Sequence, residues 1–323
     1  MTTDYRNPVA ATFHGILDLF KKHEPIGELD PALRMDDKTC LVTGANSGMG
    51  RAIAAQLARR GATVIMACRS GIPEVGEALQ RETGSQNIRM IKLDLADLDA
   101  VAACCAQLRE EGVRLDRLIL NAGLVPLEPT RTRQGFEMMF GVHFIGNMAL
   151  VQGLLADGTL PRGQDDPARI VFVSSETHRS GRPLDFDSFG EFHAYSATGS
   201  IAQYGHSKLA MTAYAMELAE RERGQLAVHA VCPGPINSGI ARDAPGAFKP
   251  LLGVVMKLLF ASPDKAAEPV MYLTCAPEIA DETGIYLHLM SRKDPAPAAC
   301  DPATRSELWR RGEAFLAHGA PTA

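Results

Sequence analysis

The sequence predicts an α/β fold in which a parallel sheet of about seven strands is covered by helices on both faces. From Thr39 onward, short apolar runs alternate with stretches of helical periodicity, which is the pattern of successive βαβ units. The runs are apolar throughout, as expected of strands buried between two layers of helices. No change in composition marks a linker, so we expect a single doubly wound domain.

Seven runs qualify as strands because β-branched and aliphatic residues dominate each of them. In chain order they are Thr39–Thr43, Thr63–Cys68, Arg89–Leu93, Arg117–Leu120, Arg169–Ser174, Ala227–Cys232 and Ile285–Leu289. A helix over Arg51–Arg60 is expected after the first strand, and residues 37–323 are expected to form the main domain.

Three segments depart from this alternation. Apolar residues recur at helical spacing between Val9 and Phe20, so residues 1–36 are expected to be an N-terminal helical extension docked on the protein's own core; attachment to a membrane or a partner is less favoured. The stretch 176–203 is rich in Gly, Pro, Ser and Asp, and a long loop in a compact domain is more often functional than idle. The apolar segment Phe248–Phe260 is either core or the lid of an apolar pocket.

The overall composition argues against several classes of protein. A net charge of −5 and a pI near 6.0 argue against nucleic acid as the main partner. No apolar run is expected to span a bilayer as a transmembrane segment, and the N-terminus lacks the pattern of a secretory signal. The seven cysteines contain no C-x-x-C pair, so we expect buried free thiols, no metal site and a cytoplasmic location.

A glycine-rich loop follows the first strand. It reads Thr43-Gly44-Ala45-Asn46-Ser47-Gly48-Met49-Gly50, and the expected helix begins at once. Glycines permit a tight turn and let backbone N–H groups approach a pyrophosphate at a helix N-terminus. A plain strand-to-helix turn rarely needs three glycines, and no Gly-Lys-Ser/Thr follows. A dinucleotide site of Rossmann type is therefore favoured over a P-loop.

The end of the second strand, Ala67-Cys68-Arg69-Ser70, bears on the choice of cofactor. An acidic side chain there binds the ribose 2′-hydroxyl of NAD, whereas an arginine suits the 2′-phosphate of NADP. Arg69 has no acidic neighbour, and we expect Arg51 to add charge nearby, so NADP (NADPH) is favoured over NAD. The alternative is an ordinary solvated arginine.

Tyr204 and Lys208 are four residues apart in a helical stretch, so they share one face of that helix. A lysine ammonium beside a tyrosine favours the phenolate and lowers the pKa of the hydroxyl from about 10. Such a phenol donates or accepts a proton near neutral pH. Alone, the pair is equally compatible with an exposed lysine beside a half-buried tyrosine, and the other motifs decide between the two interpretations.

Together these motifs resemble those of the short-chain dehydrogenases/reductases. The shared elements, in chain order, are Thr43-Gly44-x-x-x-Gly48-x-Gly50, Asn121-Ala122-Gly123, Ser175 and Tyr204-x-x-x-Lys208. The resemblance runs from about Lys38 to the C-terminus and is closer to the retinol dehydrogenase-like branch. That branch is indicated by Ala67-Cys68-Arg69, Val173-Ser174-Ser175, Asp185-Phe186-Asp187, Thr283-Gly284-x-Tyr286 and Leu308-Trp309.

The resemblance implies a role for each matching position. Tyr204 would be the acid/base, Lys208 would lower its pKa and bind the nicotinamide ribose, and Ser175, rather than Ser174, would hydrogen-bond the substrate oxygen. Asp94 would contact the adenine, and Ser238 would hold the carboxamide. The cofactor contacts implied in full are Gly44, Ser47, Gly48, Met49, Gly50, Arg69, Asp94, Leu95, Asn121, Ala122, Gly123, Tyr204, Lys208, Pro233, Gly234 and Ser238.

One departure from the family pattern concerns the proton relay. Relatives carry an asparagine in the helix after the fourth strand, where it positions a water that links the lysine to solvent. Here His143 occupies that position, in the run Gly141-Val142-His143-Phe144-Ile145-Gly146-Asn147. A neutral imidazole both donates and accepts, so His143 is a candidate catalytic residue, with Asn147 one turn later as partial compensation. A packed core histidine is the other interpretation.

Two functions follow from these patterns. The favoured one is an NADP-dependent oxidoreductase that interconverts a carbonyl and an alcohol on a lipophilic small molecule, within a dinucleotide-binding and catalytic domain over residues 37–323. Its substrate pocket is expected between the 176–203 loop and the segment after Pro233. The alternative is an NADP(H)-binding sensor or scaffold with impaired catalysis, motivated by His143 and the N-terminal extension. Relatives are often dimers or tetramers, which leaves homo-oligomer formation open.

Overall fold

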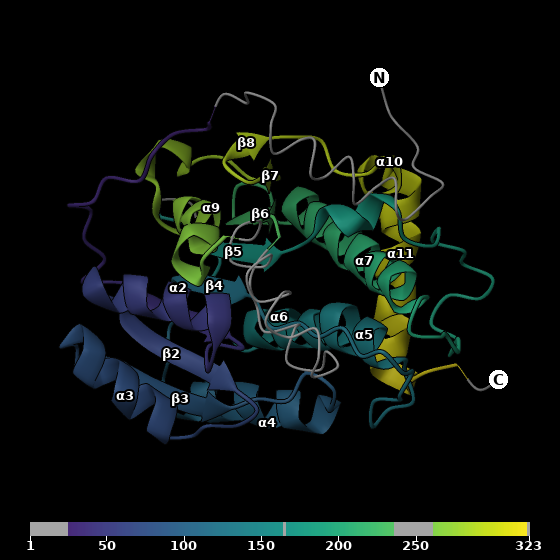
Figure 1. Ribbon diagram of the computed structural model, residues 1–323, viewed down its shortest axis with the longest axis horizontal. Coiled ribbons are helices and arrows are strands. Elements are labelled where there is room, and N and C mark those ends of the chain that lie inside the picture. Colours follow the sequence, from purple (N-terminus) through teal and green to yellow (C-terminus); the bar gives the residue numbers. More distant parts are fainter. Residues whose placement is uncertain (1–24, 164–165, 236–260, 322–323) are drawn as a thin grey trace, which may run out of the picture.

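The computed structural model describes residues 25–163, 166–235 and 261–321 and places one sheet between two layers of helices (Figure 1). The strand order is β3-β2-β1-β4-β5-β6-β7-β8; the first seven strands run parallel, and β8 pairs antiparallel with β7. The strands are β1 (Thr39–Thr43), β2 (Thr63–Cys68), β3 (Ile88–Lys92), β4 (Arg117–Leu120), β5 (Ala168–Val173), β6 (Leu226–Cys232), β7 (Tyr286–His288) and β8 (Ser291–Arg292). The predicted doubly wound fold is confirmed.

Helices fill the connections between these strands. The α-helices are α2 (Gly48–Arg59), α3 (Glu74–Thr83), α4 (Leu98–Glu110), α5 (Met138–Phe140), α6 (Asn147–Ala156), α7 (Ser200–Arg221), α9 (Pro263–Cys275), α10 (Pro297–Cys300) and α11 (Pro302–His318). A π-helical turn, η1 (Gly141–Gly146), joins α5 to α6, and the 3-10 turns are η2 (Glu176–Arg179) and η5 (Pro277–Ile279).

The predicted strands agree closely with those observed. Three of them, β1, β2 and β4, have the predicted bounds, and the others differ by one residue at one or both ends. The extra strand β8 has only two residues, too few for any periodicity to reveal. The expected first helix begins three residues earlier than predicted, at Gly48, because the glycines of the loop already belong to its first turn.

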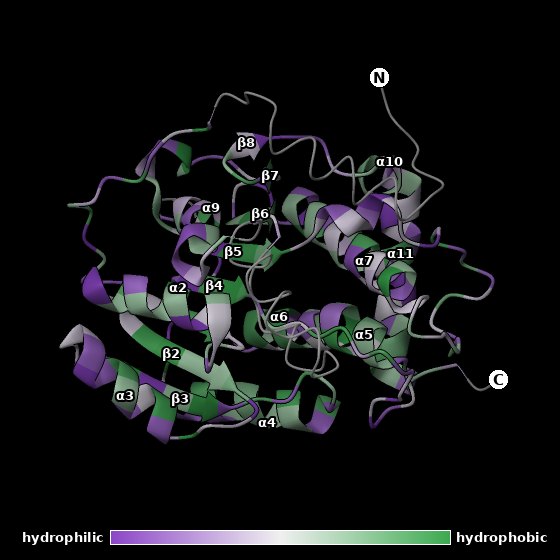
Figure 2. Cartoon of the chain, viewed as in Figure 1, coloured by the Kyte–Doolittle hydropathy of each residue, from purple (hydrophilic) through white to green (hydrophobic). Residues whose placement is uncertain are grey.

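The strands bury side chains on both faces, which explains their continuously apolar sequences. Along β1, Leu41 points into one core cluster, while Cys40 and Val42 point into the other. The first cluster includes α4, α6, α7 and α11, and the second includes α2 and α9. Figure 2 shows the same division, with hydrophobic colour along the strands and hydrophilic colour on the outer faces of the helices.

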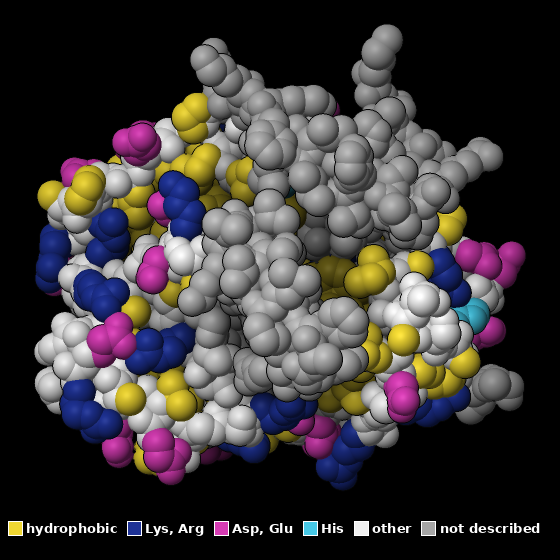
Figure 3. All heavy atoms as spheres, viewed as in Figure 1, with side chains coloured by type: hydrophobic (Ala, Val, Ile, Leu, Met, Phe, Trp, Pro, Cys, Tyr) yellow, Lys and Arg dark blue, Asp and Glu magenta, His cyan; other side chains and the backbone are white. Residues whose placement is uncertain are grey.

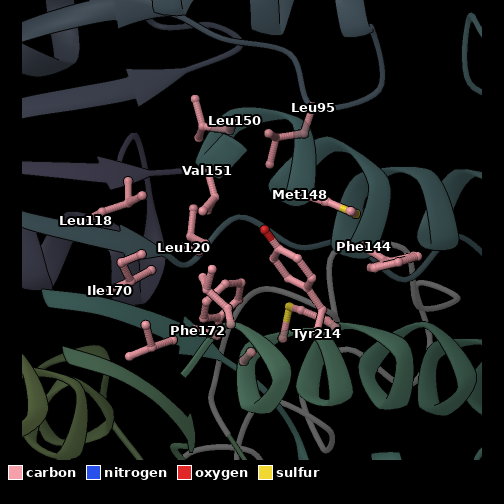
Figure 4. Packing of buried hydrophobic residues seen from close by; sticks show 14 of the residues in the cluster. Leu95, Leu118, Leu120, Phe144, Met148, Leu150, Val151, Ile170, Phe172 and Tyr214 are labelled. Carbon is pink, nitrogen blue, oxygen red and sulfur yellow. The ribbon is translucent and has the colours of Figure 1, made fainter. Parts of the chain in front are cut away.

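The larger core lies beneath α6 and α7. Phe172 from β5 packs edge-on against Tyr214 from α7, with ring centroids 5.8 Å apart, and leucines of β4 fill the space toward α6 (Figure 4). On its other side, Tyr214 stacks on Trp309 of α11 at 5.3 Å. The C-terminal helix is therefore part of the core and holds α7 against the sheet.

Two expectations about the periphery need comment. Residues 25–36, the described part of the N-terminal segment, form no helix. They are held by hydrogen bonds to residues next to α2 and β7; for example, the Arg60 side chain donates to the Leu33 carbonyl. The helix expected between Val9 and Phe20 lies outside the described residues. The chain does contain one described helical stretch long and apolar enough to cross a bilayer, Met138–Ala156, contrary to expectation; 78% of its most apolar window is buried inside the protein.

Candidate active site

The candidate residues gather at one edge of the sheet because β1, β4, β5 and β6 are adjacent and parallel (Figure 1). The glycine loop follows β1, Asn121 follows β4, Ser175 follows β5, and Pro233 follows β6. The chain order reverses between β1 and β4, and such switch points are where open α/β sheets bind ligands. The topology thus brings together motifs that are up to 190 residues apart in the sequence.

The glycine loop has the geometry of an anion cradle. Gly44 and Gly48 adopt φ values of 65° and 55°, which side chains rarely tolerate. A Cβ on Gly50 would overlap the Gly44 carbonyl, whereas a Cβ on Gly48 would meet nothing within 4 Å. Ser47, at the N-cap of α2, makes no side-chain capping bond, and the first turn holds no acid. The first backbone N–H groups of α2 therefore fit a pyrophosphate.

Thr43 and Asn121 lock this loop to the end of β4. The Thr43 hydroxyl accepts hydrogen bonds from the backbone N–H groups of Asn121 and Ala122, both at 3.0 Å. The Asn121 amide donates to the Thr43 carbonyl at 2.9 Å. Asn121 thus acts on the cofactor groove through the backbone of the glycine loop. Thr43 was not among the predicted site residues, although its place between the strand and the first glycine was a usable signal.

Arg69 lies at the open end of β2, exposed beside the glycine loop. The Asn46 amide of that loop donates to the Ser70 carbonyl at 3.2 Å, and Lys92 of β3 donates to the Arg69 carbonyl at 2.6 Å. Lys92 therefore adds a second cation here, which the sequence reading missed because β3 is a neighbour only in the folded sheet.

Arg51, which was expected to add charge nearby, is engaged in an ion pair. Its guanidinium forms a 2.6 Å ion pair with Glu82 of α3, which also binds Arg59 at 2.7 Å. Figure 3 shows the result on this face, where basic and acidic side chains alternate over α2 and α3. The cationic corner therefore consists of Arg69 and Lys92.

The remaining predicted cofactor residues occupy the same edge. Asp94 accepts a hydrogen bond from the Ala96 N–H through one carboxylate oxygen. Leu95 is buried in the core, so its side chain is not available to a ligand and only its backbone borders the groove. Gly123 lies near Lys208, and Pro233 and Gly234 follow β6 at the rim. Ser238 and the segment Phe248–Phe260 lie outside the described residues.

Tyr204 and Lys208 share one face of α7, as predicted. The Lys208 ammonium lies 5.7 Å from the centre of the Tyr204 ring and donates to the Val173 carbonyl at 2.7 Å. Burial lowers the pKa of Lys208 to about 7. Burial also raises the pKa of Tyr204, with a hydrogen bond from Ser175 acting in the opposite direction. The Tyr204 pKa is therefore raised in the protein alone, not lowered as expected, because burial disfavours the phenolate.

The two serines after β5 have different surroundings. The Ser174 hydroxyl is buried and bonds the Thr212 hydroxyl at 2.6 Å, so it belongs to the packing of α7. The Ser175 hydroxyl is only half-buried, accepts from the Thr177 hydroxyl at 3.0 Å and reaches Tyr204. Of the two serines, Ser175 is therefore the one that reaches Tyr204, and its role toward a substrate oxygen stays a prediction.

A half-buried ionic cluster lies next to Ser175 in the chain. The carboxylate of Glu176 accepts from the Tyr286 hydroxyl at 2.7 Å and from Lys293 at 2.6 Å, and it pairs with Arg179 at 3.0 Å. These neighbouring charges hold the pKa of Glu176 at about 2, although burial acts against them as the largest single influence. The cluster anchors the start of the 176–203 loop to β7. In the Thr-Gly-x-Tyr motif, the Tyr286 hydroxyl therefore has a structural role, because it donates to Glu176.

His143 lies in η1 and is fully buried beside Tyr204 and Lys208. Its Nδ1 is 2.8 Å from the Ser207 hydroxyl, its Nε2 accepts from the Leu124 N–H at 3.1 Å, and its ring meets the Tyr204 ring edge-on at 5.5 Å. Asn147 donates to the His143 carbonyl at 2.9 Å. Burial, reinforced by the Lys208 charge, holds the His143 pKa well below its usual range.

A cavity of about 210 Å³ lies on the opposite side of α7 from Tyr204. Phe140, Arg182, Phe189, Gln203 and His206 are among its lining residues, whereas Ser175, Tyr204 and Lys208 are not. It is therefore not the expected substrate pocket, whose other wall lies outside the described residues. Within the described ranges, no group of His, Cys, Asp and Glu side chains is arranged to hold a metal ion.

Comparison with known proteins places this geometry in context. The family profile for short chain dehydrogenase matches residues 38–246. Retinol dehydrogenase 14 of Mus musculus is 36% identical over 302 residues, covering 89% of this chain and 88% of that protein. Retinol dehydrogenase 13 of Homo sapiens is 34% identical, covering 98% and 97%, and polyprenol dehydrogenase of Mus musculus is 33% identical, covering 85% and 82%.

Solved structures of other proteins have the same fold. A protein from Mycobacterium Paratuberculosis superposes with a TM-score of 0.67 at 28% identity, covering 90% of this chain and 98% of that one. A short chain dehydrogenase from Escherichia coli CFT073, solved in complex with NADPH, superposes with a TM-score of 0.61 at 25% identity, covering 80% and 98%.

Proposed function

The chain belongs to the short-chain dehydrogenase/reductase family, in its retinol dehydrogenase-like branch, and on that premise we propose that it is an NADP-dependent oxidoreductase of lipophilic carbonyls and alcohols. Membership establishes an NAD(P)-dependent enzyme that acts on alcohol or carbonyl groups. The preference for NADP, the lipophilic substrate and the role of Tyr204 are the proposed parts.

The observation that carries the proposal is the shared location of Ser175, Tyr204 and Lys208 beside the glycine loop. A bound nicotinamide would exchange a hydride with the substrate carbon. In the direction of reduction, the Tyr204 hydroxyl gives its proton to the carbonyl oxygen while Ser175 holds that oxygen by a hydrogen bond. Lys208, fixed by the Val173 carbonyl, keeps a positive charge close to the phenolate that results.

Three observations support NADP and a lipophilic substrate. Arg69 and Lys92 supply two cations at the end of β2 and β3, where the fold places the adenosine ribose. A neighbour of the same fold was solved with NADPH. The relatives named above act, by their names, on retinol and polyprenol, which are long apolar alcohols. We therefore propose an aldehyde or alcohol with an extended apolar chain.

Replacing Tyr204 with Phe tests the catalytic assignment. The variant loses the only proton donor proposed for the reacting oxygen, so turnover should fall by at least about 100-fold while NADPH affinity stays within about threefold. The measurement is NADPH oxidation with hexanal, decanal and all-trans-retinal, together with NADPH binding by fluorescence. Tyr195→Phe is the matched control, because it removes the same hydroxyl from a tyrosine that instead bonds Glu137.

The outcomes separate the enzyme from the alternative. Full activity in Tyr204→Phe would refute the acid/base role. Tight NADPH binding without turnover of any carbonyl by the wild-type chain would favour the sensor with impaired catalysis, for which the replacement of the usual asparagine by His143 is the structural motive.

We also propose a cytoplasmic location. All seven cysteines are free, and six of them are buried, as suits a reducing compartment. The full-length chain should remain in the supernatant after centrifugation of a cell lysate; recovery in the membrane pellet would refute this location.

A further inference from the structure

The hydrogen bonds around His143 form a series that runs in one direction, from Leu124 through His143 and Ser207 to Tyr204. A backbone N–H can only donate, so the bond from Leu124 requires Nε2 to be the unprotonated nitrogen. The proton of the neutral ring is then on Nδ1, which donates to the Ser207 hydroxyl at 2.8 Å. That leaves the Ser207 O–H free to donate to the Tyr204 carbonyl, also at 2.8 Å. Each donor in this series of hydrogen bonds then has an acceptor.

From this series of hydrogen bonds we infer that His143 is a positioning residue, which holds Tyr204 in place through Ser207 and carries no proton during the reaction. Its ring ties three elements together: η1, the loop after β4 at Leu124, and the first turns of α7. The edge-on contact with the Tyr204 ring restricts that ring directly. This positioning role rests on the proposed function of Tyr204.

The surroundings of the ring oppose proton transfer. A second proton on Nε2 would point at the Leu124 N–H and turn a hydrogen bond into a clash of two donors. The buried imidazolium would also lie close to the Lys208 ammonium, since a Cβ on Gly123 would be 3.2 Å from Nε2 and 3.9 Å from the lysine nitrogen. His143, which replaces the family's asparagine, therefore keeps hydrogen bonds to its neighbours but cannot pass a proton.

A double-mutant cycle tests whether His143 acts through Ser207. His143→Leu and Ser207→Ala should each lower kcat for NADPH-dependent reduction of decanal by about 10- to 100-fold, since small misplacements of a reacting group have effects of this size. KM and NADPH affinity should stay within about threefold. Because both variants break the same series of hydrogen bonds, the double variant should lose no more than about threefold beyond the worse single variant. His143→Asn, which can still donate to Ser207, should recover most of the activity.

His229→Leu is the matched control. It replaces another fully buried histidine, on β6, which lies on the same face of the strand as Val231 of the second core and whose ring nitrogens have no hydrogen-bond partner among the described residues. Its kcat should equal that of the wild type. Additive losses in the cycle, or an unchanged kcat in His143→Leu, would overturn the positioning role.

Nitrogen NMR of histidine-labelled protein gives a second test that needs no activity. The His143 signal, assigned by its absence in His143→Asn, should show the neutral ring with the proton on Nδ1 and should not shift between about pH 6 and about pH 9. Titration in that range, or a proton on Nε2, would refute the inference. If the wild-type chain reduces no carbonyl, the proposed function fails, while the NMR result still decides the state of His143.

Discussion

At the scale of single residues, the candidate site depends on a few side chains whose partners come from distant parts of the chain. Arg69 is the clearest case, because it is exposed at a strand end and derives its proposed role from position alone. Lys92 donates to its backbone carbonyl, and Arg51, which the sequence also suggested, is neutralised by Glu82. The preference for NADP therefore depends mainly on Arg69.

Arg69→Asp should weaken NADPH binding by at least about tenfold and change NADH binding by less than about twofold. The 2′-phosphate of NADPH adds close to two negative charges, which the new carboxylate would repel. Isothermal titration with both cofactors measures the difference. Arg109→Asp, the same charge change on the exposed face of α4, should leave both affinities unchanged. An equal loss for NADPH and NADH would contradict the NADP preference.

At the scale of elements, two buried arginines hold α9 against the sheet. Arg117 of β4 donates to the Thr274 carbonyl at 3.0 Å, and Arg169 of β5 donates to the Ala276 carbonyl at 2.7 Å. These carbonyls lie at the C-terminus of α9, where a helix leaves acceptors without partners and carries partial negative charge. The two guanidiniums thus satisfy a helix end that packing has removed from water.

Arg169→Met should lower the free energy of unfolding by about 1–3 kcal/mol, because it keeps the apolar stem but leaves buried carbonyls without a donor. Urea denaturation followed by circular dichroism measures the loss. Arg114→Met, an exposed arginine whose side chain is 69% accessible, should change stability by less than about 0.5 kcal/mol. Equal stability of the Arg169 variant and the wild type would show that water can reach this helix end.

At the scale of the whole molecule, both faces of the sheet are dry, and among the described residues four buried histidines have lowered pKa values, which favours the neutral form. His178 and His206 have their pKa values lowered by burial to about 4, His229 to about 3, and His143 well below its usual range. Below about pH 6.5 the unfolded chain binds protons that the folded chain excludes. Stability should therefore fall as the pH drops from about 6.5 toward 3, by up to about 1.4 kcal/mol per pH unit for each histidine.

His229 should contribute to this acid sensitivity without any compensating bond, because neither ring nitrogen has a hydrogen-bond partner among the described residues. His229→Leu should move the midpoint of acid unfolding to lower pH, as followed by circular dichroism across a pH series. His318→Leu, at an exposed site on α11, serves as the comparison and should leave the midpoint where it is. An unchanged midpoint in His229→Leu would mean that the other histidines or the carboxylates govern acid unfolding.

The sequence by itself determined the order of strands and helices, the glycine loop and the identities of Ser175, Tyr204 and Lys208. The elements, the glycine loop and the Tyr204–Lys208 pair depend on local composition and on spacing along one element, whereas Ser175 was indicated by the resemblance to the family. Only the tertiary structure decided that Arg51 pairs with Glu82 and that Thr43 binds the backbone after β4. It also decided that both ring nitrogens of His143 form hydrogen bonds, with Leu124 and Ser207. It also reversed the expected pKa shift of Tyr204, because the degree of burial, which disfavours the phenolate, is a property of the whole packed molecule.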